Sequence, residues 1–492
     1  MSVLEELRSF LDRRLVKWIA LAVMLLWVAK VAVDHKYCVR DNDMWWHIKT
    51  GDWIVEHAAV PHNGLFSWTA ANRPWVAYSW GYEVMLSRAY DWFQLMGLGV
   101  LTVVLTLLIA YLQFWSLRRL RGSFWQAALL AIVSFYTYLF TIGPRPVFAS
   151  ILFYIVLLTL LLEASRSGQI KHLYWLPLVF LVWANLHIQF VYGIAVLGLF
   201  VVCQLVSRWA ERFGIAQAII TPPSLPSAKL LLILGACLLA TLIGPYSYHL
   251  YQVVFLYSGA KYSYQIIVEL QPLTFRLPIN FVQLLLTAAG FCAVGWRKRI
   301  DLFKLSLMIV ASLLAFRTLR DCWFVAVTAA AFIADFPLPE SERDAGETPV
   351  EGGMLVATLA IFLVFLSQTT DFNERALDHY ASLEFPVDAV NYLRRHPLPG
   401  PLYNNFDWGG FLTWYMPQFP VAIDGRNDLY GDDLDRIFFQ SQSALDYKSD
   451  PYLRQSGFVL VGKKYALSTL LRVDPQFELV YEDKIAAVFA RR

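Results

Sequence analysis

The segment KWIALAVMLLWVAKVAVD, residues 17–34, decides the fold class of this chain. It is apolar over almost its whole length, and a helix needs roughly 20 such residues to cross the hydrocarbon core of a bilayer. Comparable apolar segments follow at 95–116, 124–142, 147–163, 173–189, 190–208, 229–244, 278–296, 302–316, 321–338 and 353–369. We therefore predict a polytopic α-helical membrane protein with about 11 transmembrane helices.

The composition of the 492 residues agrees with this fold class. The chain is 58% hydrophobic and 16% charged, whereas soluble domains carry about 25% charged residues. If the N-terminus lies in the cytoplasm, the loops on that side carry more Lys and Arg than the opposite loops, as the positive-inside rule requires. We therefore expect a multi-pass protein of the inner (plasma) membrane with a cytoplasmic N-terminus. The sequence contains no basic stripe of the kind that binds nucleic acid.

Residues 35–94 form a long loop that follows the first apolar segment. Two of its segments, GDWIVEHAAV at 51–60 and WGYEVMLSRAYDWF at 80–93, place apolar residues at helical spacing but are too short and too amphipathic to span a membrane. Helices of this kind suit the membrane interface. The predicted orientation puts this loop on the extracytoplasmic side.

The composition changes after residue 370. Residues 371–492 alternate helical and strand patterns, with strands expected at GPLYNNF (400–406), PVAIDGR (420–426), GFVLVGKK (457–464) and FELVYEDKIAAVFAR (477–491). This alternation predicts a small extracytoplasmic α/β domain. We expect residues 1–370 to form the transmembrane module that precedes it. Within this domain, Asp424 and Arg426 are expected to form a buried turn network, with acceptor binding as the functional alternative.

The stretch CVRDNDMWWHIKTGDW, residues 38–53, places two carboxylates just beyond the first apolar segment. Asp41 and Asp43 are two residues apart and would not share a helix face, but in an extended stretch both can point to one site. They could supply a general base or hold a divalent cation such as Mg²⁺ or Mn²⁺. One of them could instead simply cap the helix expected to begin near Met44.

Further polar residues fall in short turns on the same predicted side. Arginine forks match the paired oxygens of a phosphate, although an arginine at a helix end can also simply extend into the interface. We predict that Arg145, Arg317 and Arg320 bind a phosphate. The substrate-binding candidates are His47, Glu83, His187, Gln189 and Glu269.

Several of these motifs resemble those of bacterial membrane glycosyltransferases of the GT-C fold class and of related polytopic proteins. The likeness covers most of the chain. It lies in the first outer loop from DNDMWWHIKTGDW onward, in GPRP (143–146), NLHIQF (185–190), GPYSYHLY (244–251), ELQPL (269–273) and RTLRDCWF (317–324), and in NNFDWGGFLTWYMPQFPVAIDGRNDLYG (404–431).

This resemblance implies a GT-C-like fold and an inverting transfer of a sugar from a polyprenyl-phosphate donor to a glycan, lipid or protein acceptor. It also implies that an acid of the first outer loop acts as base or metal ligand, for which Asp43 is the first candidate and Asp41 the second. Better-known members often carry adjacent acids, whereas Asn42 separates them here. Basic residues would receive the donor phosphate.

Two other functions are compatible with this topology. A non-catalytic assembly or scaffold protein of cell-envelope polysaccharide synthesis would have its outer polar groups scattered or paired off. A transporter would carry ionisable residues near the membrane midplane and broken helices in matching halves, and the sequence has few midspan charges and no matching halves. Convergence of the aspartates and arginines in one cavity would favour the enzyme.

Overall fold

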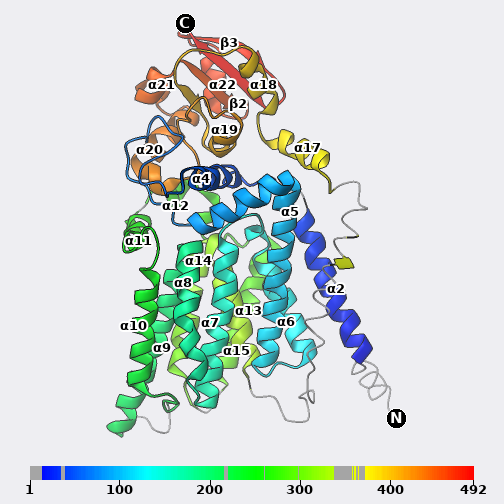
Figure 1. Ribbon diagram of the computed structural model, residues 1–492, viewed down its shortest axis with the longest axis vertical. Helices are drawn as coiled ribbons and strands as arrows, with labels where there is room; N and C mark the ends of the chain where they lie inside the picture. Colours follow the sequence, from blue (N-terminus) through cyan, green and yellow to red (C-terminus); the bar gives the residue numbers. More distant parts are fainter. Residues whose placement is uncertain are drawn as a thin grey trace.

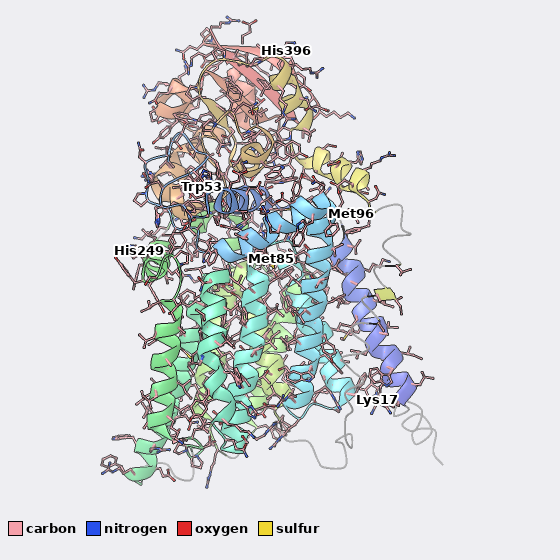
Figure 2. All side chains as sticks on the ribbon, in the orientation of Figure 1. Lys17, Trp53, Met85, Met96, His249 and His396 are labelled. Carbon is pink, nitrogen blue, oxygen red and sulfur yellow. The ribbon has the colours of Figure 1, made fainter. Side chains whose placement is uncertain are left out.

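The chain is a helical membrane protein in which a helix bundle carries a smaller layer of helices and strands at one end (Figure 1). A computed structural model describes residues 14–34, 39–214, 220–259, 261–296, 299–336, 357, 360, 361, 364 and 372–492. Lys17, near the start of the first helix, and Met96, at the bend of α5, lie at opposite ends of the bundle (Figure 2).

Five helices in the described part of the chain are long and apolar enough to cross a membrane. They are α2 (Arg14–Val33), α5 (Trp80–Arg119), α7 (Val147–Ser167), α9 (Phe190–Arg212) and α13 (Pro278–Gly295). Shorter helices run alongside them in Figure 1: α6 (Phe124–Thr137), α8 (Leu176–Leu186), α10 (Ser227–Thr241), α14 (Leu302–Arg317) and α15 (Cys322–Ala334). The last predicted span, 353–369, lies almost entirely outside the described residues.

The pattern of burial in the bundle suits a lipid environment. Nearly every residue of α15 is buried, so this helix lies at the centre of the bundle. In contrast, Leu232 on α10, Leu285 on α13 and Leu313 on α14 are about 70% exposed. Water would disfavour so many large exposed apolar side chains, whereas lipid chains would cover them.

The loop of residues 39–94, called the first outer loop after its predicted side, lies across one end of the bundle (Figure 1). Helix α4 (Met44–His57) and the first part of α5 run roughly perpendicular to the spanning helices (Figure 1). Helix α5 then bends at Gln94, whose φ is 54°, and continues into the membrane. The carboxylate of Glu374 accepts hydrogen bonds from the main-chain N–H groups of Leu95 and Met96, so it satisfies the start of the spanning part. The segment predicted as a helix at 80–93 is thus helical and is joined to the next span, whereas its position at the membrane interface stays a prediction.

Four short elements connect the helices at the same end of the bundle. They are α11 (His249–Gly259), α12 (Ser263–Ile266), and the 3₁₀ turns η3 (Val268–Leu270) and η4 (Leu319–Asp321). Two further 3₁₀ turns are η1 (Leu139–Thr141) and η2 (Lys171–Trp175). The turns η3 and η4 are in contact with each other, since the main-chain N–H of Leu319 donates to the carbonyl of Gln271.

The C-terminal layer contains a four-stranded sheet of order β1-β2-β4-β3. Strand β1 (Leu402–Asn404) pairs parallel with the fully buried β2 (Phe458–Gly462). Strands β4 (Ala486–Arg491) and β3 (Phe477–Glu482) pair antiparallel, and β4 also pairs antiparallel with β2. The remaining elements are α17 (Glu374–Glu384), α18 (Val387–Arg395), η6 (Phe406–Trp408), α19 (Gly409–Tyr415), α20 (Asn427–Gln442), η7 (Tyr447–Ser449), α21 (Pro451–Gln455) and α22 (Ala466–Leu471).

The prediction of a strand at 420–426 is wrong. This segment does not join the sheet, and it makes a single parallel bridge between Val421 and Ser67 of the first outer loop. The main-chain N–H of Val421 donates to the carbonyl of Phe66, and the N–H of Trp68 donates to the carbonyl of Val421. The apolar run that suggested a strand is buried because it packs against this loop.

A second contact joins the C-terminal layer to α4. The indole of Trp45 is fully buried, and three aromatic rings contact it edge-on at centroid distances of 5.4 to 5.6 Å. These rings belong to Phe385, Phe411 and Tyr415. A Cβ at Gly410 would lie 2.4 Å from the carbonyl oxygen of Asn42, so α19 approaches the start of α4 as closely as a glycine permits. Large buried aromatic contacts of this kind make the two parts one packed unit.

Candidate active site

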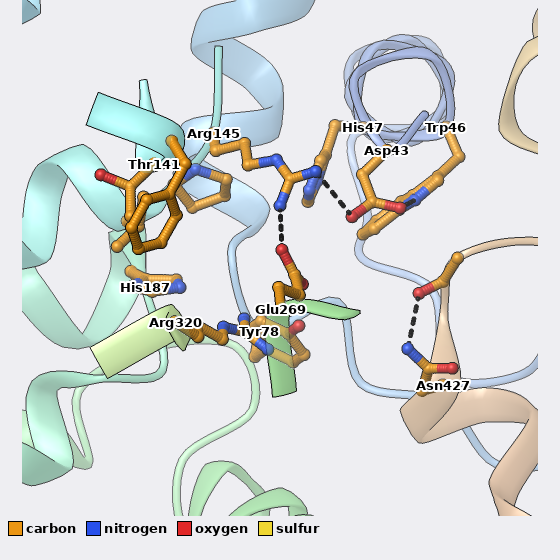
Figure 3. Close-up of a pocket in the computed structure, with 14 residues that line it drawn as sticks. Asp43, Trp46, His47, Tyr78, Thr141, Arg145, His187, Glu269, Arg320 and Asn427 are labelled. Carbon is orange, nitrogen blue, oxygen red and sulfur yellow. Dashed lines mark hydrogen bonds and ion pairs between the residues drawn. The ribbon is translucent and has the colours of Figure 1, made fainter. Parts of the chain in front are cut away.

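Arg145 brings together carboxylates from three distant parts of the chain. Its Nε and Nη2 groups donate to the two oxygens of Asp41, with 3.0 Å between Nη2 and Oδ1, and its Nη1 group donates to Oε2 of Glu269 at 2.6 Å. Its Nη2 atom also lies 3.9 Å from Oδ2 of Asp43. Burial opposes the charge on Arg145, but Asp41 and Glu269 outweigh burial and raise its pKa. The guanidinium therefore stays charged at the centre of this group (Figure 3).

The Asp43 carboxylate is held in the site rather than used to cap α4. Asp43 occupies the N-cap position, but its side chain makes no capping hydrogen bond. Its Oδ1 atom accepts a hydrogen bond from Nε1 of Trp46 at 3.1 Å, and its main-chain N–H donates to Asp41. Burial raises the pKa of Asp43 to about 7, although Arg145 opposes this shift. Asp43 can therefore exchange a proton near neutral pH.

Glu269 differs from Asp43 although both carboxylates lie beside Arg145. Burial again favours the protonated form, but the positive charges of Arg145 and Arg320 outweigh it, and the pKa of Glu269 lies below its ordinary value. Glu269 is therefore ionised at neutral pH. Environments that make the pKa values of two neighbouring acids differ in this way are typical of sites that use one acid as a base and the other as a fixed charge.

Two histidines line the same site, and a buried partner orients each of them. Nδ1 of His47 lies 3.0 Å from Oε1 of Glu83, and Nδ1 of His187 lies 2.7 Å from the hydroxyl of Ser150. That hydroxyl also accepts a hydrogen bond from Nε1 of Trp183. Burial, together with nearby arginines, lowers the pKa of both histidines. Both rings are therefore neutral at pH 7.

These groups line a cavity of about 70 Å³ at the end of the bundle (Figure 3). Its walls are formed by Asp43, Trp46, His47, Tyr78, Phe140, Thr141, Arg145, Pro146, Val147, His187, Glu269, Arg320, Gly425 and Asn427. A larger cavity of about 520 Å³ adjoins it and shares six of these residues, including Asp43 and Arg145. The smaller, polar cavity is therefore continuous with the larger one.

The larger cavity has two unlike walls. The wall on the membrane side is mainly apolar and contains Ile266, Ile267, Val268, Leu277, Ile279 and Leu319. The opposite wall belongs to the C-terminal layer and contains Phe406, Asp407, Gly425, Asn427 and Phe439. The cavity thus lies between the end of the helix bundle and the C-terminal layer.

Most of the residues predicted from the sequence converge on this site. Those that line the smaller cavity are Asp43, His47, Arg145, His187, Glu269 and Arg320. Asp41 and Glu83 do not line this cavity, but Asp41 accepts a hydrogen bond from Arg145 and Glu83 contacts His47. Gln189 is buried and donates to the Asp321 carboxylate, next to Arg320, so it contacts the turn that carries this arginine and not the cavity.

Arg317 does not join the group, which corrects the prediction that it shares the cavity. Its guanidinium lies over the ring of Tyr264, 4.9 Å from the ring centre. Helix α14 ends at Arg317, and the 3₁₀ turn η4 that follows directs Arg320 toward the cavity. The buried Asp424–Arg426 pair, in contrast, forms as predicted, with both side chains fully inaccessible.

Sequence reasoning missed the contributions of Trp46, Tyr78, Thr141, Gly425 and Asn427. Tryptophan, tyrosine, threonine and glycine are residue types that usually have structural roles at such positions, and none of them carries a charge. Asn427 follows the Asp424–Arg426 network directly, and this proximity was the only signal that could have identified it. Their placement depends on contacts between the first outer loop and the C-terminal layer.

The carboxylates do not fit a bound Mg²⁺ or Mn²⁺ in this arrangement. A divalent cation bridging Asp41, Asp43 and Glu269 would occupy the position that the guanidinium of Arg145 holds. Among the described residues, no group of three or more His, Cys, Asp or Glu side chains could hold a metal ion.

No protein-family model and no curated protein matches the chain. Among solved structures, the chain is similar to the crystal structure of ArnT from Cupriavidus metallidurans bound to undecaprenyl phosphate. The two are 14% identical with a TM-score of 0.47, and the match covers 96% of this chain and 98% of that one. This identity and TM-score are too low to support a function.

Proposed function

We propose that this protein is a membrane glycosyltransferase that moves a sugar from a polyprenyl-phosphate donor to a hydroxyl of an extracytoplasmic glycan, lipid or protein. One observation carries the proposal. A carboxylate whose pKa is about 7 and two arginines line one cavity, which opens into a larger space with an apolar wall. A scaffold protein has no need for this convergence, because its polar groups would serve equally well if dispersed.

The donor phosphate binds between Arg145 and Arg320 in this proposal. Arginine has five N–H donors, and the contacts to Asp41 and Glu269 use three of those on Arg145. The remaining donors can bind phosphate oxygens, and charge-assisted bonds of this type are about twice as strong as neutral ones. Asp41 and Glu269 hold the guanidinium in place, so it does not need to reorganise when the lipid phosphate leaves.

Asp43 acts as the general base. The acceptor hydroxyl transfers its proton to the Asp43 carboxylate while its oxygen forms a bond to the anomeric carbon of the sugar. The bond between that carbon and the phosphate oxygen breaks, and both of its electrons leave with the polyprenyl phosphate. Arg145 and Arg320 stabilise the negative charge on this leaving group. Attack from the face opposite the phosphate inverts the anomeric centre.

The larger cavity receives parts of both substrates. The prenyl chain nearest the phosphate lies along the apolar wall formed by α12, η3 and the start of α13, and the acceptor enters from the wall that contains Phe406 and Phe439. The two aromatic rings are 5.1 Å apart and suit contact with a sugar ring. Assays with defined donors would identify the sugar and the acceptor.

The test is transfer by the purified full chain in lipid nanodiscs. The substrates are labelled polyprenyl-phosphate sugars, with an envelope extract as the source of acceptor. Release of polyprenyl phosphate that depends on both the protein and the acceptor supports the proposal. Tight binding of polyprenyl phosphate without any turnover over a panel of donor sugars would contradict it and would favour a scaffold.

The pH dependence of transfer should follow the ionisation of Asp43. A base acts only when deprotonated, and burial raises the pKa of Asp43 to about 7. We therefore expect kcat/KM to reach a plateau above pH 7 and to fall about tenfold per pH unit below it. His47 and His187 should not contribute, because burial keeps their pKa values low. A flat profile between pH 5.5 and 8, measured with donor in limiting amount, would exclude Asp43 as the base.

A further inference from the structure

Gly425 of the C-terminal layer lies directly against the Asp43 carboxylate. A Cβ at this position would lie 1.9 Å from Oδ1 of Asp43 and 3.3 Å from Nε1 of Trp46. These are the two atoms of the hydrogen bond that orients the carboxylate. Gly425 does not have the positive φ that favours glycine, so the requirement at this position is for space and not for backbone conformation.

The two residues that flank Gly425 form a buried ion pair with each other, which holds the loop that carries Gly425 in one conformation. Nε and Nη2 of Arg426 donate to the two oxygens of Asp424 at 2.8 and 2.5 Å, and both side chains are fully buried. The hydroxyl of Tyr430 donates to the same carboxylate. Breaking a buried pair of this kind leaves an uncompensated charge, so the loop is strongly held in one conformation.

The same loop is attached to the first outer loop, which also contains Asp43. The hydroxyl of Thr69 donates to the carbonyl of Ala422 at 2.5 Å, and Nη2 of Arg426 donates to the carbonyl of Leu65. The guanidinium of Arg426 also lies over the ring of Trp75 at 4.7 Å. The position of Gly425 relative to Asp43 is therefore determined by side chains and main-chain groups from both parts of the protein.

We infer that loop 421–428 of the C-terminal layer is part of the catalytic centre, and that Gly425 is the positioning residue that sets where the Asp43 carboxylate points. This inference rests on the proposed function. It makes the C-terminal layer necessary for the chemical step itself, and not only for acceptor binding or for stability. Gly425 itself acts by contact alone, because it provides no side chain that could touch a substrate.

The test compares Gly425→Ala and Trp46→Phe, singly and together, in the full chain. The added methyl group should displace the carboxylate, and an error of about 1 Å in the position of a reacting group can cost about 10²-fold in rate. We expect kcat to fall by about that factor, with the KM for the donor unchanged within about twofold. Trp46→Phe releases the same oxygen, so the double variant should lose little more than the worse single variant.

Gly235→Ala is the matched control, because a Cβ at Gly235 meets no atom within 4 Å and the residue lies on α10, away from the cavity. It should keep wild-type kcat. If Gly425→Ala does not yield folded protein, Thr69→Val replaces it: removing the bond to Ala422 should lower kcat and leave the donor KM unchanged. A folded Gly425→Ala protein with kcat within about twofold of wild type, losses that multiply in the double variant, or an unaffected Thr69→Val protein would each overturn the inference. An inactive wild-type protein would instead overturn the proposed function on which it rests.

Discussion

Replacing Asp43 by Asn should reduce kcat for sugar transfer by about 10³-fold, within the range of 10² to 10⁴ that general base catalysis contributes. The amide has nearly the shape of the carboxylate and can still accept the hydrogen bond from Nε1 of Trp46. It cannot accept a proton from the acceptor hydroxyl. The loss should therefore appear in kcat, with little change in the affinity for polyprenyl phosphate.

The matched control for this experiment is Asp435→Asn. Asp435 is fully buried, and burial raises its pKa to about 7 as well. However, it accepts a hydrogen bond from Ser263 and lines neither cavity. Transfer should survive in this variant. Turnover by Asp43→Asn within about tenfold of wild type would rule out Asp43 as the base, since it would lie below the smallest effect expected for such a residue.

Replacing Arg145 by Gln should cost both transfer and stability. The phosphate loses a charge-assisted donor pair, which should lower kcat/KM by about 10³-fold. The Asp41 carboxylate, which is only 7% exposed, loses the guanidinium that compensates its charge. Leaving a buried carboxylate unpaired costs about 3 kcal/mol. We therefore expect a clearly lower Tm in nanodiscs together with the loss of transfer.

Two further variants separate these effects of Arg145. Arg145→Lys keeps a positive charge near Asp41 and Glu269 but has no planar fork, so it should restore most of the Tm and little of the transfer. The double variant Asp41→Asn with Arg145→Gln removes the unpaired charge of Asp41 and should recover part of the Tm without recovering transfer. Full transfer by Arg145→Lys would show that a point charge suffices and would contradict the role given to the bidentate fork.

The sequence alone determined the helical membrane class and the positions of several of the long helices. The apolar runs at 147–163 and 190–208 lie within long helices, the run at 17–34 overlaps α2 in all but its last residue, and the pattern at 80–93 correctly marked a helix before the span at 95–116. Local periodicity is enough for this, because the bilayer imposes the length and the apolarity of each span on the residues within it. The prediction of a strand at 420–426 was wrong, because this segment is buried by contact with Ser67 and its neighbours, more than 300 residues away in the sequence.

The tertiary structure alone decided which polar residues meet. Arg317 and Arg320 are equally plausible in the sequence, but only Arg320 lines the cavity, because the turn η4 intervenes between them. Gly425 has no chemical signature, and its importance arises entirely from its contact with Asp43. Side-chain charge and type are properties of one position, whereas the cavity is formed by segments that only packing brings together. The sequence thus determined the candidate residues, and the fold determined which of them share one site.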